Sequence, residues 1–352
     1  MSEDILATLA GLAGGVLLGL AARLGRFCTL GAIEDALYGK EWLRMRMWAF
    51  AIATSIAATF LLADQGLITL EETIYLTQSW NPLACISGGL MFGYGMAMAG
   101  SCGYGALARL GGGDMRYFVL SLVIAISAAM AVGGPTAYLR VFLFPPEASE
   151  ASATGIAHLL SERLALSKLT IALIIAGAIA LFALGNKEFR KSPKAIITSL
   201  AVALAIISGW LATSYLFEES FEEIGVASHS FTVPVGDTLM YLMTASGGGL
   251  SFAVGSVAGV LGGAFLGSLI KGHFRWEACD DPRELRRQIL GGFFMGTGGV
   301  IALGCTIGQG ISAFSTLAVS APVVMLSIIA GAAIGLHQLV VGFRFAFWKQ
   351  PS

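Results

Sequence analysis

The sequence predicts an all-α polytopic membrane protein, and three observations support this prediction. Only 12 % of the 352 residues are charged, whereas soluble globular proteins have about 25 %. Hydrophobic residues make up 56 % of the chain, and the mean hydropathy is +0.78. Several segments also reach the roughly 20 mainly apolar residues that a helix needs to cross a bilayer. A soluble core of this size would need a polar shell that the chain cannot supply.

Nine segments are long and apolar enough to be expected as spans. They are residues 4–24, 43–63, 82–100, 117–143, 168–185, 194–217, 249–270, 288–304 and 322–342. The third and the eighth are short and rich in glycine. Nine crossings would place the two termini on opposite sides of the membrane.

The positions of lysine and arginine predict the orientation of these spans. All but three of the 21 basic residues fall on one side of the predicted topology, the exceptions being Arg140, Arg163 and Lys168. Because basic residues collect on the cytoplasmic side, we expect the N-terminus outside and the C-terminus in the cytoplasm. The acidic start of the chain does not resemble a secretory leader. A net charge of −1 gives no indication of nucleic acid as a partner.

Part of the sequence is repeated. Residues 88–105 align without a gap on residues 291–308 at an offset of 203, and the identical positions include Cys102 and Cys305. We therefore expect one transmembrane domain, residues 1–352, in which repeat 1 (about 4–143) and repeat 2 (about 194–342) are joined by a linker helix (about 168–185). A single linker span would invert one repeat relative to the other, which is common in transporters. Alternatively, an old duplication now serves only packing.

Four segments are too short or too interrupted to span, namely residues 25–39, 101–114, 229–246 and 305–318. We expect them to be re-entrant half-helices, because irregular backbone at membrane depth is tolerated where protein buries it or water reaches it. A half-helix that begins at the midplane directs its positive end inward, which suits an anion. Glycine can instead mark tight helix packing. That interpretation suits Gly259, Gly262, Gly263 and Gly267 within one predicted span.

The cysteines fall into two groups. Cys28, Cys102 and Cys305 stand at interruptions, whereas Cys85 and Cys279 are interpreted as ordinary apolar residues. There is no CxxC pair and no metal-binding histidine spacing, so we expect neither a metal nor a cofactor. Neutral thiols are soft, weak donors that cost little to desolvate, and weak successive sites favour passage of an ion. The alternative is an enzyme, a membrane sulfurtransferase or thiol-redox protein, that uses these cysteines as thiolates.

Further residues near the interruptions are candidates for a substrate path. Gln309 follows Cys305 by one helical turn, and Glu34 is either a proton-coupling group or a residue of the cytoplasmic mouth. Arg26 and Arg109 could attract an anion or simply fix the topology. The full set of predicted path residues is Cys28, Cys102, Cys305, Gln309, Gly105, Gly308, Ser230 and Glu34.

Three motifs resemble those of the YeeE/YedE family of sulphur-transport membrane proteins. They are Gly-Arg-Phe-Cys at 25–28, Gly-Ser-Cys-Gly-Tyr-Gly-Ala-Leu-Ala-Arg-Leu-Gly-Gly-Gly at 100–113 and Gly-Cys-Thr-Ile-Gly-Gln-Gly-Ile-Ser at 304–312, with a family-like stretch at 274–277. The resemblance implies an hourglass-shaped thiosulfate uptake protein of the bacterial inner membrane, which is not an enzyme. It implies a constriction lined by Cys28, Cys102 and Cys305, and a cytoplasmic TusA-like sulfur carrier as partner. Members of the family also handle other sulfur or selenium species, and the chain shows no fused carrier or rhodanese domain.

Overall fold

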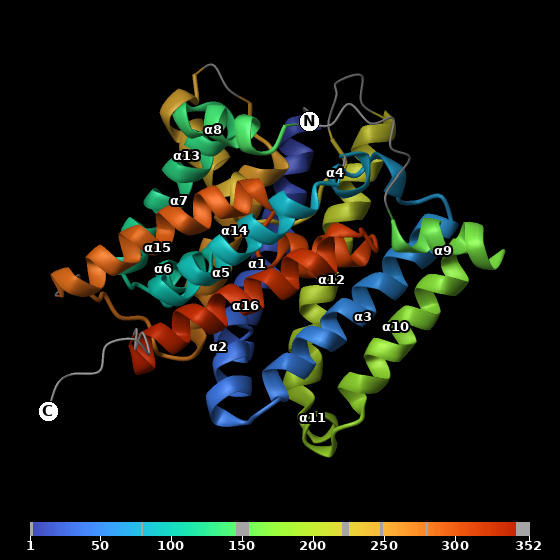
Figure 1. Cartoon of the computed structure of the whole chain (residues 1–352), viewed down its shortest axis with the longest axis horizontal. Coiled ribbons are helices and arrows are strands. Elements are labelled where there is room, and N and C mark those ends of the chain that lie inside the picture. Colours follow the sequence, from blue (N-terminus) through green and yellow to red (C-terminus); the bar gives the residue numbers. More distant parts are fainter. Residues whose placement is uncertain are drawn as a thin grey trace, which may run out of the picture.

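The computed structural model describes residues 3–78, 80–145, 155–219, 225–246, 249–278 and 281–342, and these form an all-helical structure without strands (Figure 1). The elements are α1 (Glu3–Gly25), α2 (Thr29–Glu34), the π-helical turn η1 (Asp35–Gly39), α3 (Leu43–Asp64), the 3-10 turn η2 (Leu70–Glu72), α4 (Ile74–Thr77), α5 (Pro82–Ala99), α6 (Gly103–Gly111), α7 (Arg116–Gly133), α8 (Pro135–Leu143), α9 (Ile156–Leu164), α10 (Lys168–Leu184), α11 (Lys187–Lys191), α12 (Pro193–Glu219), α13 (Val233–Thr244), α14 (Phe252–Ile270), α15 (Pro282–Ile301), the π-helical turn η3 (Gly308–Ala313) and α16 (Ser320–Val341). Cys279 lies outside the described residues.

Seven helical stretches in the described part of the chain are long and apolar enough to cross a membrane, or up to eight if the bent pair α9–α10 forms one span. Large apolar side chains cover much of the outside, among them Leu181 and Ile270, which are more than 70 % exposed. A soluble protein does not expose so much contiguous apolar surface. The prediction of a helical, multi-pass membrane protein is confirmed.

The predicted count of nine spans is not confirmed. Each predicted segment contains a helix, but α10 has only 17 residues and α15 begins with the charged turn Pro-Arg-Glu-Leu-Arg-Arg. The segment 117–143 is interrupted at Gly133-Gly134-Pro135, where Gly134 is extended (φ −103°, ψ −158°) and Pro135 starts the separate helix α8. Proline has no N–H to continue the ladder and favours the first turn of a new helix.

Three of the four predicted re-entrant segments contain a short helix that follows an interruption (α2, α6 and α13), and the fourth contains η3. It is not confirmed that any of them enters the membrane and returns to the same side. α2 and η1 continue below α1 in Figure 1, and Glu3–Gly39 forms one candidate span. α5 and α6 likewise form one candidate span, Pro82–Gly111. Residues 225–232 are a loop that leads into α13, and the last segment contains only the short turn η3.

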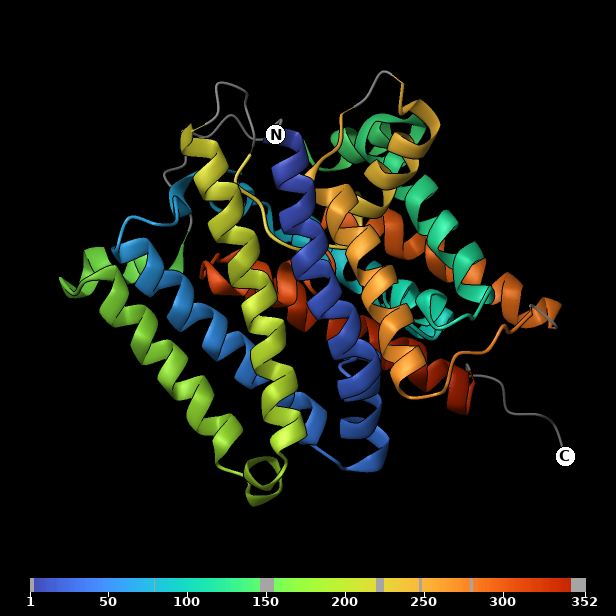
Figure 2. The same ribbon diagram turned by 180° about the vertical axis from the view of Figure 1, so that it is seen from behind.

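Glycines bring α1 and α14 into backbone contact, and the two helices lie side by side in both views (Figures 1 and 2). A Cβ on Gly15 would lie 2.3 Å from the carbonyl oxygen of Ser256, and one on Gly259 would lie 2.3 Å from that of Leu12. Such contacts require small residues at one-turn spacing. The packing interpretation is therefore confirmed for Gly259, and it holds equally for Gly263, whereas Gly262 faces open space.

The first and last parts of the chain make reciprocal contacts. α1 packs on α14 and α12 on α3, while α5 packs on α16 and α15 on α7. Where α5 crosses α15, a Cβ on Gly88 would lie 2.8 Å from the carbonyl oxygen of Gly298, and a Cβ on Gly95 would lie 2.5 Å from that of Gly291. Gly88 and Gly95 align with Gly291 and Gly298 in the sequence repeat. Gly88 of the first repeat therefore contacts Gly298, and Gly95 contacts Gly291, so the two contacts are exchanged when the repeats are exchanged.

A charged cluster fixes the loop before α15 to the start of α7. Arg116 forms ion pairs with Asp114 at 2.8 Å, Glu277 at 3.2 Å and Glu284 at 3.3 Å. The backbone adds a bridge, because Met115 N–H donates to the carbonyl of Glu277 at 3.0 Å. This cluster joins segments that are more than 160 residues apart in sequence.

Candidate functional site

Three cysteines precede short helical segments deep in the protein. Cys28 is the N-cap residue of α2, and Cys102 is the N-cap residue of α6, where its Sγ accepts the Gly105 N–H at 3.4 Å. Cys305 precedes η3, and its Sγ accepts the Gly308 N–H at 3.4 Å. Unpaired N–H groups collect at such starts and carry partial positive charge. All three thiols thus stand where a negative charge is favoured.

The loop before α13 connects two of these cysteines. Phe231 N–H donates to Cys305 Sγ at 3.2 Å, and the Ser230 hydroxyl lies 3.8 Å from the same sulfur. The carbonyl oxygen of Phe231 is only 2.6 Å from the position that a Cβ on Gly103 would occupy. Phe231 therefore fits between Cys305 and the first turn of α6, and only glycine allows that approach.

The three thiols form one cluster. Cys28 and Cys305 both lie close enough to Cys102 to act electrostatically on its thiol. Cys102 and Cys305 are 0 % and 1 % exposed, whereas Cys28 is half-buried. The structure thus brings together the three cysteines that the sequence singled out. All three thiols are free.

Each of these cysteines has a neighbour in sequence with a buried hydroxyl. Thr29 follows Cys28 and Ser101 precedes Cys102, and in the described structure neither of these two hydroxyl oxygens has a hydrogen-bond partner. Thr306 follows Cys305, and its hydroxyl interacts with the Cys102 thiol. All three residues are at most 1 % exposed. The Ser101 oxygen and Cys102 Sγ both lie within 3.6 Å of a Cβ built on Gly105. Buried hydroxyls without partners are costly, so those of Thr29 and Ser101 are candidate donors to a ligand.

The two predicted path glycines lie beside this cluster. A Cβ on Gly308 would lie 2.6 Å from the Ser230 oxygen and 3.1 Å from the Tyr75 hydroxyl oxygen. A Cβ on Gly105 would lie 2.4 Å from the Ser101 oxygen. Side chains at either position would fill space next to the thiols.

Gln309 and Glu34, also predicted as path residues, have other surroundings. The Gln309 amide donates to the carbonyls of Ala302 at 3.0 Å and Leu303 at 3.2 Å, so it satisfies backbone that α15 leaves open at its end. No hydrogen bond joins it to the Cys305 thiol in the described structure. Glu34 is exposed at the C-terminal end of α2. Neither side chain is placed by the structure against the sulfur cluster.

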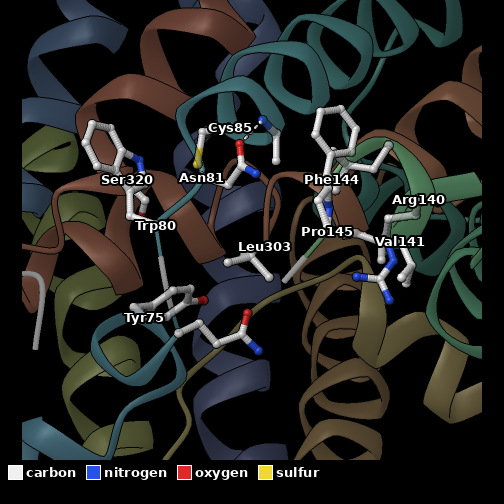
Figure 3. A pocket seen from close by; sticks show the side chains of 14 residues that line it. Tyr75, Trp80, Asn81, Cys85, Arg140, Val141, Phe144, Pro145, Leu303 and Ser320 are labelled. Carbon is white, nitrogen blue, oxygen red and sulfur yellow. Dashed lines mark hydrogen bonds between the residues drawn. The ribbon is translucent and has the colours of Figure 1, made fainter. Parts of the chain in front are cut away.

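A cavity of about 440 Å³ approaches the cluster from the side of α4 and α8 (Figure 3). Its lining includes Tyr75, Asn81, Cys85 and Arg140. Cys85 is buried, as the sequence analysis expected, and the Trp80 indole lies beside its thiol. Sequence reasoning missed Tyr75, whose ring packs edge-on against Trp210 with centroids 6.3 Å apart.

Two further cavities are also relevant. One of about 320 Å³ is lined by hydroxyl groups and includes Ser230. The other, of about 740 Å³, contains five basic side chains and two acidic ones: Arg23, Arg26, Arg44, Lys194, Lys271, Asp35 and Glu41. Arg26 thus lines a basic cavity, whereas Arg109 stacks on Tyr117 with its guanidinium carbon 4.9 Å from the ring centroid.

Comparison with known proteins identifies the family. A family model described as sulphur transport matches residues 24–334. The chain belongs to this family. It is 26 % identical over 317 residues to the thiosulfate transporter TsuA of Spirochaeta thermophila, and this alignment covers 88 % of this chain and 92 % of the relative. It is 25 % identical over 329 residues to the thiosulfate transporter TsuA of Escherichia coli, with 86 % of each chain covered. The resemblance seen in the motifs is confirmed, and a role in sulfur transport follows.

Proposed function

We propose that this protein takes up thiosulfate, with Cys28, Cys102 and Cys305 as successive weak sites at a central constriction. The observation that carries the proposal is that a buried hydroxyl neighbours each thiol in sequence, and that those of Thr29 and Ser101 have no partner in the described structure. Thiosulfate has a soft sulfane sulfur at one end and three hard oxygens at the other. A thiol suits the first end and a hydroxyl suits the second.

The sulfur of Cys305 accepts the N–H groups of Phe231 and Gly308. Its own hydrogen faces only the Ser230 hydroxyl, at 3.8 Å between the sulfur and the oxygen, where either group can donate. In the proposal this weakly held hydrogen turns to the sulfane sulfur. Desolvating a dianion is costly, and the oriented N–H groups and helix starts around the thiols offset part of that cost. Because each contact is weak, the anion can leave one site for the next.

The proposed order of sites is Tyr75, Cys305, Cys102 and Cys28. The Tyr75 hydroxyl oxygen lies 3.1 Å from a Cβ built on Gly308, and the Cys305 sulfur accepts the Gly308 N–H. Phe231 contacts both Cys305 and the first turn of α6, which Cys102 caps. In the proposed direction the anion passes from the side of α4 towards the basic cavity. That cavity is lined by five basic residues, all on the predicted cytoplasmic side. These side chains would hold the anion before a TusA-like carrier receives it.

The architecture in this proposal is a single domain of two inverted repeats in the inner membrane, with nine crossings, the N-terminus outside and the C-terminus in the cytoplasm. The reciprocal glycine contacts between α5 and α15 support the two inverted repeats. If a two-fold axis relates the repeats, every contact between them occurs twice with the partners exchanged. The distribution of basic residues supports the orientation.

Uptake of labelled thiosulfate by proteoliposomes tests the proposal. We expect Cys102→Ala and Cys305→Ala each to lower the uptake rate by about tenfold or more, because one lost donor interaction of about 1.4 kcal/mol corresponds to a factor of ten. Cys279→Ala is the control, since the proposal does not use that cysteine. Undiminished uptake by both cluster variants would exclude the thiol sites.

The same preparation separates transport from enzymatic sulfur transfer. A sulfurtransferase would carry a persulfide or a disulfide among the three cysteines after exposure to thiosulfate. Intact-protein mass spectrometry detects either product. We expect the mass to remain unchanged while the anion accumulates inside the vesicles. A stoichiometric gain of one sulfur atom (a persulfide, with sulfite released) or loss of two hydrogens (a disulfide) would favour the enzyme.

A further inference from the structure

The cavity in Figure 3 lies between the loop before α5, the helix α8 and the end of α15. We infer that this cavity is an outer anion site, in which Arg140 and the N-terminus of α5 attract a small sulfur oxyanion and Tyr75, on the other side of the cavity in Figure 3, receives it before it reaches Cys305. The inference rests on the proposed function and adds a binding site to it.

Arg140 supplies the positive charge of this site. It is one of only three basic residues on the predicted outer side of the chain, and it lines the cavity. Its Nε donates to the carbonyl of Ala131 at 3.0 Å, whereas its two terminal nitrogens form no hydrogen bond within the described residues. A guanidinium fixed at one nitrogen presents the others to an oxyanion in a planar fork.

The start of α5 adds a second favourable group. Asn81 is its N-cap residue, with Oδ1 accepting the Ala84 N–H at 3.1 Å, and Asn81 also lines the cavity. α5 has 18 residues, so its N-terminus carries the partial positive charge of a full helix dipole. The Asn81 carboxamide nitrogen is unused by the cap and is a further donor.

Tyr75 connects this cavity to the sulfur cluster. It is 8 % exposed and lines the cavity, yet its hydroxyl has no hydrogen bond in the described part of the structure. The same hydroxyl oxygen lies 3.1 Å from a Cβ built on Gly308, and the Ser230 oxygen, 3.8 Å from Cys305 Sγ, lies 2.6 Å from that Cβ. A hydroxyl that has no hydrogen-bond partner and belongs to a residue lining the cavity is available to an oxyanion oxygen.

The walls of the cavity favour a compact anion with a soft end. Val141, Phe144 and Pro145 are apolar and line it beside Arg140, and low polarity strengthens the attraction between a guanidinium and an anion. The Cys85 thiol is a fourth soft donor in this lining. The site therefore offers hard donors for oxygens and a thiol for sulfane sulfur, like the inner cluster.

Initial rates of thiosulfate uptake by proteoliposomes of neutral lipid test the site. We expect Arg140→Gln and Tyr75→Phe to raise KM about three- to tenfold with little change in kcat, because a partly exposed contact contributes less than a buried one. The matched controls are Arg163→Gln, an exposed outer arginine, and Tyr138→Phe, whose ring is 83 % exposed. Arg140→Lys should recover part of the wild-type KM. Wild-type kcat/KM should also fall more steeply with salt than that of Arg140→Gln.

The outcomes separate this inference from the proposed function. If wild-type protein takes up no thiosulfate, both are overturned. If wild-type uptake is normal and Arg140→Gln and Tyr75→Phe match their controls, only the outer anion site is overturned. A KM effect of Arg140→Gln confined to vesicles with anionic lipid would overturn it too, since Arg140 would then bind a lipid phosphate. An effect in neutral lipid with rescue by Arg140→Lys supports it.

Discussion

Gly103→Ala tests whether the geometry of the sulfur cluster depends on the contact between α6 and the loop before α13. The added Cβ would lie 2.6 Å from the carbonyl oxygen of Phe231, whereas such contacts are not tolerated under 3.0 Å and are ordinary from 3.4 Å, so one segment must move by 0.4 to 0.8 Å. Phe231 N–H donates to Cys305 Sγ at 3.2 Å. A displacement of that size away from α6 would lengthen or redirect this hydrogen bond.

The magnitude follows from two contributions. Overpacking a tight contact costs about 1–3 kcal/mol, and loss of a modest hydrogen bond costs about 0.5–1.5 kcal/mol. We therefore expect a lower melting temperature and an uptake rate reduced by about tenfold, because the Cys305 thiol no longer has its fixed position. The chain should still insert and purify, since α6 itself tolerates alanine well.

The assay compares uptake by proteoliposomes with the melting temperature of the same preparation in detergent. Gly262→Ala is the matched control, because a Cβ on Gly262 would have no neighbour within 4 Å. If Gly103→Ala and Gly262→Ala gave the same uptake rate, the proposed role of the Phe231 contact would be refuted.

Three further outcomes are expected. Gly308→Ala should lower uptake severalfold relative to Gly177→Ala, whose Cβ meets open space, because its methyl group would fill the gap between two hydroxyls; equal rates would contradict this. Arg116→Gln should lower stability by about 1 kcal/mol, discounted for its partial exposure, and calorimetric melting checks it. Lys168 donates to Glu71 at 2.9 Å and lowers the pKa of that carboxyl. Glu71 therefore stabilises the fold above its unfolded pKa of about 4.3 by at most about 0.5 kcal/mol. That gain disappears as the pH falls through the lowered folded pKa, so wild type and Glu71→Gln should melt alike in acid.

The sequence predicts that the cysteines belong together, because each of them stands at an interruption that is visible in its own short stretch of sequence. Cys102 and Cys305 align at a fixed offset, and each is followed by glycines that permit a helix to begin close to other backbone. Cys28 stood out for the same reason, since it interrupts an apolar segment. The neighbouring hydroxyls of Thr29, Ser101 and Thr306 were equally visible in the sequence. Their importance appears only once burial and hydrogen-bond partners are known.

Other features depend on contacts between distant segments. Tyr75 lies on a four-residue helix with no motif of its own, and Phe231 reaches Cys305 across 74 residues. Gln309 was assigned to the thiol by spacing alone, whereas the open carbonyls at the end of α15 compete for its amide. The predicted span 117–143 was too long because average hydropathy does not register the backbone effect of Gly133-Gly134-Pro135.

The glycine contacts between α1 and α14 have a mechanical consequence. Each helix backbone lies in the groove of the other, where even a methyl group at Gly15 or Gly259 would come within 2.3 Å of a carbonyl oxygen. If α1 moved along α14 by a fraction of a turn, side chains would replace the glycines at these contacts and would clash with the backbone of the other helix. The scaffold around the thiols is therefore expected to act as a stiff frame, and conduction should depend on side chains and short loops rather than on rocking of one half against the other.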